Sequence, residues 1–140
     1  MKKNKTCCFS GHRPKHLPWR HYEVGDTFLA FRKRLQDKIE NAIAKGYNYF
    51  ISGMAQGIDM LAAEIVLQLK ERYSNIQLEC AIPFKGQKNA FNLTDKKRYN
   101  AICQKADKIT ILEEEYLPSC LMKRNKYMVD NSSKLIACYL

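Results

Sequence analysis

Short, continuous apolar runs alternate along the chain with longer segments in which apolar residues recur every three or four positions. Runs of the first kind are typical of strands buried on both faces. They predict five strands, at residues 6–10, 48–52, 77–82, 108–112 and 134–139. The longer segments predict four helices, at residues 22–45, 57–73, 94–105 and 119–131.

Strands that alternate with helices predict right-handed crossovers and a parallel sheet with helices on both faces. We therefore expect an α/β fold with a Rossmann-like, doubly wound parallel sheet of about five strands, in the order 3-2-1-4-5. No repeat or linker divides the sequence, so one domain is expected over residues 1–140. The last strand would form a sheet edge that a second subunit could cover, giving a homo-oligomer.

Composition narrows the class of protein. Of the 140 residues, 46% are hydrophobic and 27% are charged, which excludes disordered and collagen-like architectures. No apolar run approaches the roughly 20 residues that cross a bilayer, and the N-terminus lacks the apolar stretch of a signal peptide. A cytoplasmic protein with no membrane partner is expected. The six cysteines form no CxxC pair and match no zinc-site spacing, which favours reduced thiols and no metal.

The net charge of +10 is concentrated in three blocks. Residues 1–22 carry six basic side chains and no acidic one, and smaller positive excesses lie in residues 83–99 and 119–140. A basic surface attracts phosphates and nucleic acids, although a merely solvated surface has the same composition. Two of the blocks begin at the carboxyl ends of predicted strands, where parallel sheets bind ligands. This placement favours an anionic ligand.

The segment from Ser52 to Asp59 (SGMAQGID) reads as a strand, a glycine turn and the start of a helix. Gly53 can bring the backbone close to a phosphate, and Gly57 can pack tightly at the start of the helix, whose free N–H groups would face the anion. A tight turn with Asp59 favouring the helix N-terminus explains the same residues equally well.

Two further segments carry candidate chemistry. In the turn Ser10–Pro14 (SGHRP), Arg13 can bind phosphate with two hydrogen bonds and His12 can exchange a proton, unless the loop is simply solvated. In the helix at 119–131, helical spacing places Asn125 at the centre of an apolar face and Arg124 at its edge. The apolar positions of this face are Leu121, Met122, Met128 and Val129. An amide there must bind either a loop or a ligand, and we expect the ligand.

Three ordered motifs, FSGHRP, ISGMAQGIDMLAAE and KRNKYMVDNSSKLIA, resemble the YpsA-like branch of the SLOG superfamily. That superfamily also contains the DNA-processing protein DprA and the LOG phosphoribohydrolases. The resemblance implies a Rossmann-like sheet that binds a nucleotide or nucleotide derivative. It also implies three binding loops. The first contains Gly11, His12 and Arg13, the second contains Ser52, Gly53, Gly57 and Asp59, and the third contains Arg124 and Asn125.

The sequence departs from these relatives in two ways. Relatives in this branch usually continue beyond the fifth strand into a glycine-rich turn and a helix, whereas this sequence stops at Leu140. We therefore expect a shortened C-terminus that lacks part of the phosphate-binding wall. The PGGxGT segment and catalytic acid typical of LOG enzymes are also missing, which argues against phosphoribohydrolase activity and leaves open whether the protein is an enzyme.

Two functions follow from these patterns. The first is a nucleotide-binding or nucleotide-sensing module of SLOG type. The alternative is a non-enzymatic, DprA-like or mobile-element-associated protein that binds nucleic acid or a nucleoprotein complex, or inhibits such a complex, through its basic surface. The candidate residues for this surface are Arg13, Lys15, Arg20, Lys85, Lys88, Lys96, Lys97 and Arg98. Nucleic-acid binding would weaken steeply with salt, which distinguishes the two.

Overall fold

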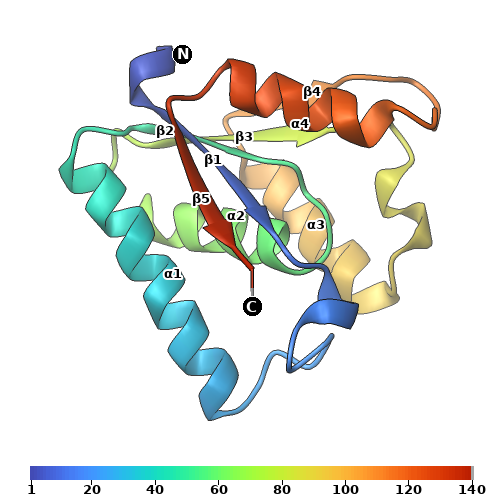
Figure 1. Cartoon of the computed structure of the whole chain (residues 1–140), viewed down its shortest axis with the longest axis horizontal. Coiled ribbons are helices and arrows are strands. Elements are labelled where there is room, and N and C mark those ends of the chain that lie inside the picture. Colours follow the sequence, from blue (N-terminus) through green and yellow to red (C-terminus); the bar gives the residue numbers. More distant parts are fainter. Residues whose placement is uncertain (140) are drawn as a thin grey trace.

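The computed structural model describes residues 1–139, which form a five-stranded sheet with helices packed against it (Figure 1). The strands are β1 (Thr6–Gly11), β2 (Tyr49–Ser52), β3 (Gln77–Ile82), β4 (Lys108–Ile111) and β5 (Lys134–Cys138). All neighbouring strands pair in parallel. The α/β class and the parallel sheet predicted from the sequence are confirmed.

The strand order is β4-β3-β2-β1-β5, so the expected order was wrong in the position of β4. This strand lies next to β3, with Ile109 aligned to Cys80, whereas β5 pairs directly with β1. The chain thus advances in one direction from β1 to β4 and then crosses back over the sheet to β5. Ligands of such sheets bind where neighbouring strands lead in opposite directions, which here is the carboxyl end of the β1–β5 pair.

The helices are α1 (Asp26–Ala44), α2 (Ile58–Leu69), α3 (Leu93–Lys105) and α4 (Cys120–Asp130). Right-handed crossovers that advance in one direction place their helices on one face of the sheet. Accordingly, α1, α2 and α3 cover one face, and α4, which belongs to the return crossover, covers the other (Figure 1). Helices on both faces were predicted, and this is confirmed.

The two faces differ in the size of their apolar cores. On the face of α1–α3, a large cluster includes Phe9, Phe50 and Leu78 from the sheet. The periodic apolar residues of α1 all point into it, namely Phe28, Phe31, Leu35, Ile39 and Ala42. On the other face, α4 contributes Met128 to a cluster with only four buried strand residues. Because this core is small, the placement of α4 depends strongly on its polar contacts.

The outer strands of the sheet are β4 and β5. Leu135 of β5 and Ile109 of β4 are exposed there. The edge position expected for the last strand is confirmed, and its cover by a second subunit stays a prediction. No helix among residues 1–139 is long and apolar enough to span a membrane.

Candidate functional site

Two adjoining cavities open at the carboxyl ends of β1, β2 and β5. The polar cavity, of about 180 Å³, is lined by Phe9, Ser10, Gly11, Arg13, Ala55, Asp59, Arg124, Asn125, Met128 and Tyr139. The outer cavity, of about 320 Å³, is lined by Arg13, Pro14, Lys15, His21, Ala55, Gln56 and Phe91. Arg13 and Ala55 line both cavities. Segments that are far apart in the sequence therefore meet at the sheet edge where a ligand was expected.

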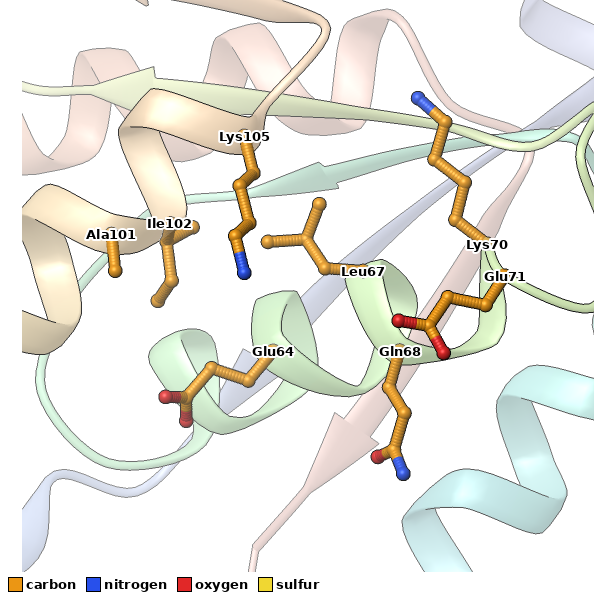
Figure 2. Close-up of a pocket in the computed structure, with 8 residues that line it drawn as sticks. All are labelled: Glu64, Leu67, Gln68, Lys70, Glu71, Ala101, Ile102 and Lys105. Atoms are coloured by element: carbon orange, nitrogen blue, oxygen red, sulfur yellow. The ribbon is translucent and has the colours of Figure 1, made fainter.

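A wider groove of about 660 Å³ lies between α2 and α3 (Figure 2). Figure 2 shows Lys105 extending from α3 toward Leu67 of α2, with Glu64 and Gln68 on the α2 side. Most of its residues belong to the second halves of the two helices, which run back toward the amino ends of the strands. The groove contains none of the residues that the sequence singled out, so the candidate site is the pair of cavities at the carboxyl edge.

The turn after β2 is held by hydrogen bonds of its own. The Ser52 hydroxyl donates to the carbonyl oxygen of Asp59 at 2.7 Å and accepts the N–H of Met54 at 3.2 Å. Met54 is fully buried and has a φ of 61°, a backbone conformation that is uncommon for residues other than glycine. Ser52 lines neither cavity, so its visible role is to fix the turn that carries Asp59.

Gly53 makes room for an arginine side chain. A Cβ atom at this position would lie 2.5 Å from Nη1 of Arg124. The Gly53 carbonyl accepts a hydrogen bond from that nitrogen and another from Nε2 of Gln87 at 3.1 Å. The space beside Gly53 in which a phosphate was expected is thus filled by the Arg124 guanidinium.

Gly57 joins the first two loops. It has a φ of 90°, and a Cβ atom there would lie 2.8 Å from the carbonyl oxygen of His12. The same oxygen accepts the N–H of Ile58 at 3.5 Å. The N–H groups at the start of α2 were expected to face the ligand, but that of Ile58 donates to the first loop instead. Positive charge at the site comes mainly from arginine side chains.

Arg124 and Asp59 place two opposite charges in the polar cavity, with only 3% and 7% of their surfaces exposed. Burial raises the pKa of Asp59, while the charges of Arg124 and Arg13 and the N–H of Ala55 oppose the rise. Burial likewise lowers the pKa of Arg124, and Asp59 opposes this change. Each residue therefore stabilises the ionised form of the other, whereas burial disfavours both ionised forms.

The expected orientation of α4 was wrong. Its buried residues are Cys120, Arg124 and Met128, spaced by four, and Asn125 is exposed at the mouth of the polar cavity. The Asn125 Oδ1 accepts a hydrogen bond from Nε of Arg124 at 2.8 Å. The helix is rotated because the Arg124 guanidinium finds an acceptor and a counter-charge beneath α4, so Asn125 does not lie at the centre of an apolar face.

Comparison with known proteins agrees with this architecture. The model of the YpsA family, described as the YspA SLOG family, matches residues 7–139. The chain belongs to this family. It is 33% identical over 126 residues to the SPbeta prophage-derived protein YoqJ of Bacillus subtilis, an alignment that covers 81% of this chain and 74% of YoqJ. A UPF0398 protein of Halalkalibacterium halodurans is 28% identical over 138 residues, covering 96% and 72% of the two chains.

In this YpsA-family chain, the predicted ligand residues divide into two groups. Gly11, Arg13, Asp59, Arg124 and Asn125 line the polar cavity. The others, His12, Ser52, Gly53 and Gly57, lie directly beside these residues in the chain or in space and line neither cavity.

The basic residues proposed for nucleic acid are more dispersed. Lys15 lines the outer cavity, and Arg20 and Lys97 are exposed. Lys85 pairs with Glu114 at 3.9 Å, and Lys88 donates to Asn100 at 2.5 Å. Lys96 is half-buried on α3. Arg98 forms ion pairs with three carboxylates, those of Glu23, Glu64 and Asp95. The charge of Arg98 is therefore balanced within the protein.

Glu79, which was not predicted from the sequence as a site residue, holds α4 in place. Its fully buried carboxylate accepts hydrogen bonds from three hydroxyl groups on three other elements. The donors are Tyr49 at 2.6 Å, Thr110 at 2.7 Å and Tyr127 at 2.5 Å. Tyr127 lies on α4 one turn beyond Arg124, so this cluster fixes the helix that supplies the cavity's arginine. An acidic residue inside the apolar run QLECAI was the signal available in the sequence.

We expect Glu79→Gln to lower the free energy of unfolding by about 1–3 kcal/mol, because hydrogen bonds to a carboxylate become weaker bonds to an amide whose NH₂ group faces hydroxyl donors. Urea denaturation measures this loss. Glu71→Gln, at an exposed position following α2, is the matched control and should change stability by less than about 0.5 kcal/mol. Equal losses of stability in the two variants would contradict the role of Glu79 in holding α4 in place.

Proposed function

We propose that this protein binds a nucleotide or nucleotide derivative, with the anionic part of the ligand held between Arg13 and Arg124 in the polar cavity. The observation that carries this proposal is the buried Arg124 side chain. Its Nε and Nη1 atoms donate to Asn125 and Gly53, and Nη2 has no acceptor among residues 1–139. Nη2 is not fully buried, so it is open to the polar cavity that Arg124 lines, and phosphate oxygens suit the planar donors of a guanidinium there.

The size and position of the cavities support a nucleotide over a simple inorganic anion. The two cavities, of about 180 and 320 Å³, together offer room for more than a phosphate group. The outer cavity adds the Phe91 ring and Pro14, which suit an aromatic base. Both lie at the carboxyl edge, beside the β1–β5 switch point, where open parallel sheets bind such ligands. Binding or sensing is the proposed activity, and no catalytic step is assigned.

Native mass spectrometry of freshly purified protein tests for a retained nucleotide, and calorimetry with a panel of nucleoside monophosphates tests binding directly. Arg13→Glu should weaken binding by roughly tenfold or more, because it places a negative charge beside the phosphate. Arg34→Glu makes the same change at an exposed position on α1 outside both cavities, and should alter affinity by less than about twofold. Equal losses in both variants would indicate a diffuse charge effect instead of a site.

A second function, binding of nucleic acid or a nucleoprotein complex, is favoured by the net charge of +10 and by the exposed Arg20 and Lys97. The similarity to the prophage-derived YoqJ agrees with a role linked to mobile elements. Under this alternative, affinity for a short DNA duplex falls steeply with salt, and Arg20→Glu and Lys97→Glu each weaken it. Nucleotide binding in the cavity instead depends on Arg13 and Arg124 and is insensitive to those two changes.

A further inference from the structure

Asp59, a residue with only 7% of its surface exposed, presents a hydrogen-bond acceptor to the polar cavity. The residue lies in the first turn of α2, and its Oδ2 atom accepts the N–H of Ala55 at 3.3 Å. Among residues 1–139, no donor reaches Oδ1, and the Asp59 carboxylate forms no direct ion pair with Arg124. Oδ1 is not fully buried, so it is open to the polar cavity that Asp59 lines, where a ligand with a hydrogen-bond donor can reach it. A ligand that enters the cavity excludes water from this oxygen and must supply a donor in its place.

The surrounding charges restrict what this donor can be. Arg13 and Arg124 line the same cavity, so a cationic donor such as an ammonium group would be repelled. A neutral hydroxyl can donate to the carboxylate while an attached anion contacts the arginines. A ligand part that carries both a hydroxyl and a phosphate, the combination found in a sugar phosphate, fits these charges.

The form of the two cavities assigns the parts of the ligand. The polar cavity, at about 180 Å³, suits one sugar ring, and Ser10, Asn125 and Tyr139 add further hydrogen-bonding groups. The outer cavity is wider and contains Phe91 and Pro14, which favour a flat aromatic base. Arg13 lines both cavities, so it then lies beside the bond between the sugar in the polar cavity and the base in the outer cavity.

We propose that Asp59 accepts a hydrogen bond from the 2′-hydroxyl of a ribose, so that the site selects ribonucleotides over 2′-deoxyribonucleotides. This inference rests on the nucleotide binding proposed above. A 2′-deoxy ligand would leave the buried carboxylate without its donor, and sites built to bind a hydroxyl discriminate strongly against analogues that lack it. Acidic side chains recognise ribose hydroxyls in the same manner in dinucleotide-binding sheets.

The experiment compares calorimetric affinities for matched pairs of nucleoside 5′-monophosphates with ribose or 2′-deoxyribose. The wild-type protein should bind the ribose member about 10- to 100-fold more tightly, the range expected for a hydrogen bond to a charged group. In Asp59→Asn, which keeps the size of the side chain and an acceptor for the Ala55 N–H, this preference should fall to about threefold or less. Asp130→Asn, an exposed change on α4, should keep the wild-type preference.

The outcomes separate this inference from the proposed function. If the wild-type protein binds both members of each pair equally, ribose selection is wrong and nucleotide binding stands. If it binds neither, nucleotide binding itself is wrong. A preference that persists in a folded Asp59→Asn protein, as judged by its thermal melt, would assign the selection to another residue and overturn the role of Asp59. The wild-type comparison needs no variant and stays decisive if Asp59→Asn does not fold.

Discussion

Arg124→Met is expected to lower the free energy of unfolding by about 2–4 kcal/mol and to abolish nucleotide binding. The methionine keeps much of the apolar stem but removes the donor to the Gly53 carbonyl and the charge that opposes the rise in the pKa of Asp59. Removing one member of a buried pair of charges is costly because the other is left in a poorly solvating environment. Urea denaturation and calorimetry with nucleoside monophosphates measure the two effects separately.

The penalty of Arg124→Met should also depend on pH. Burial raises the pKa of Asp59, so the folded protein holds the carboxyl proton of Asp59 more tightly than the unfolded chain does. The free energy of unfolding therefore falls as the pH rises from the pKa of Asp59 in the unfolded chain through its pKa in the folded protein. Without Arg124 the pKa of Asp59 rises further, so ionisation of Asp59 lowers the free energy of unfolding by more. The difference in stability between wild type and variant should therefore be greater near pH 7 than near pH 4.5.

Lys123→Met provides the control for this experiment, because it removes a neighbouring positive charge from the exposed side of α4, where Lys123 pairs with Glu113. Surface pairs of this kind contribute about 1 kcal/mol or less, so little change in stability or binding is expected. A penalty for Arg124→Met that is the same at both pH values would show that Arg124 does not support the ionised form of Asp59.

The elements of the fold were predictable because their signals are local. The five strands are short apolar runs, and the periodic residues of α1 enter the core. Burial on both faces, which such runs predict, holds for β1, β2 and β3 but not for the edge strands, because β4 has no buried residue and β5 has only two. Strand order depends on contacts between distant segments, and no local pattern distinguishes pairing of β4 with β3 from pairing with β1. The prediction therefore failed at that point, although the parallel direction of every strand was correct.

The positions of the site's loops could be predicted from the sequence, but the buried contacts of Arg124 and Glu79 could not. The glycine turns and the first loop reach the carboxyl edge because they follow strands directly. Helical periodicity treated Arg124 as an edge residue, since its burial depends on the Gly53 carbonyl and the Asp59 charge, which come from a distant segment. Glu79 was missed for the same reason, because its three hydroxyl donors lie on three different elements.

Gly57→Ala tests whether the close contact between the first two loops builds the site. Gly57 and Gly25 have almost equal φ values of 90° and 92°, in a backbone region that alanine rarely adopts, so either substitution should cost about 1–3 kcal/mol through strain alone. At Gly25 a Cβ atom meets nothing within 4 Å, whereas at Gly57 it would lie 2.8 Å from the His12 carbonyl oxygen.

The alanine at position 57 must therefore push the first loop away from α2, and with it Arg13, which follows His12 directly and lines both cavities. We expect Gly57→Ala to lose at least about 1 kcal/mol more stability than Gly25→Ala, and to weaken nucleoside monophosphate binding by roughly tenfold or more. Gly25→Ala should leave that affinity within about twofold of wild type, because position 25 lines neither cavity. Urea denaturation and calorimetry on the two variants decide the matter. Equal losses of stability with unchanged affinity would mean that the contact with His12 does not set the position of Arg13.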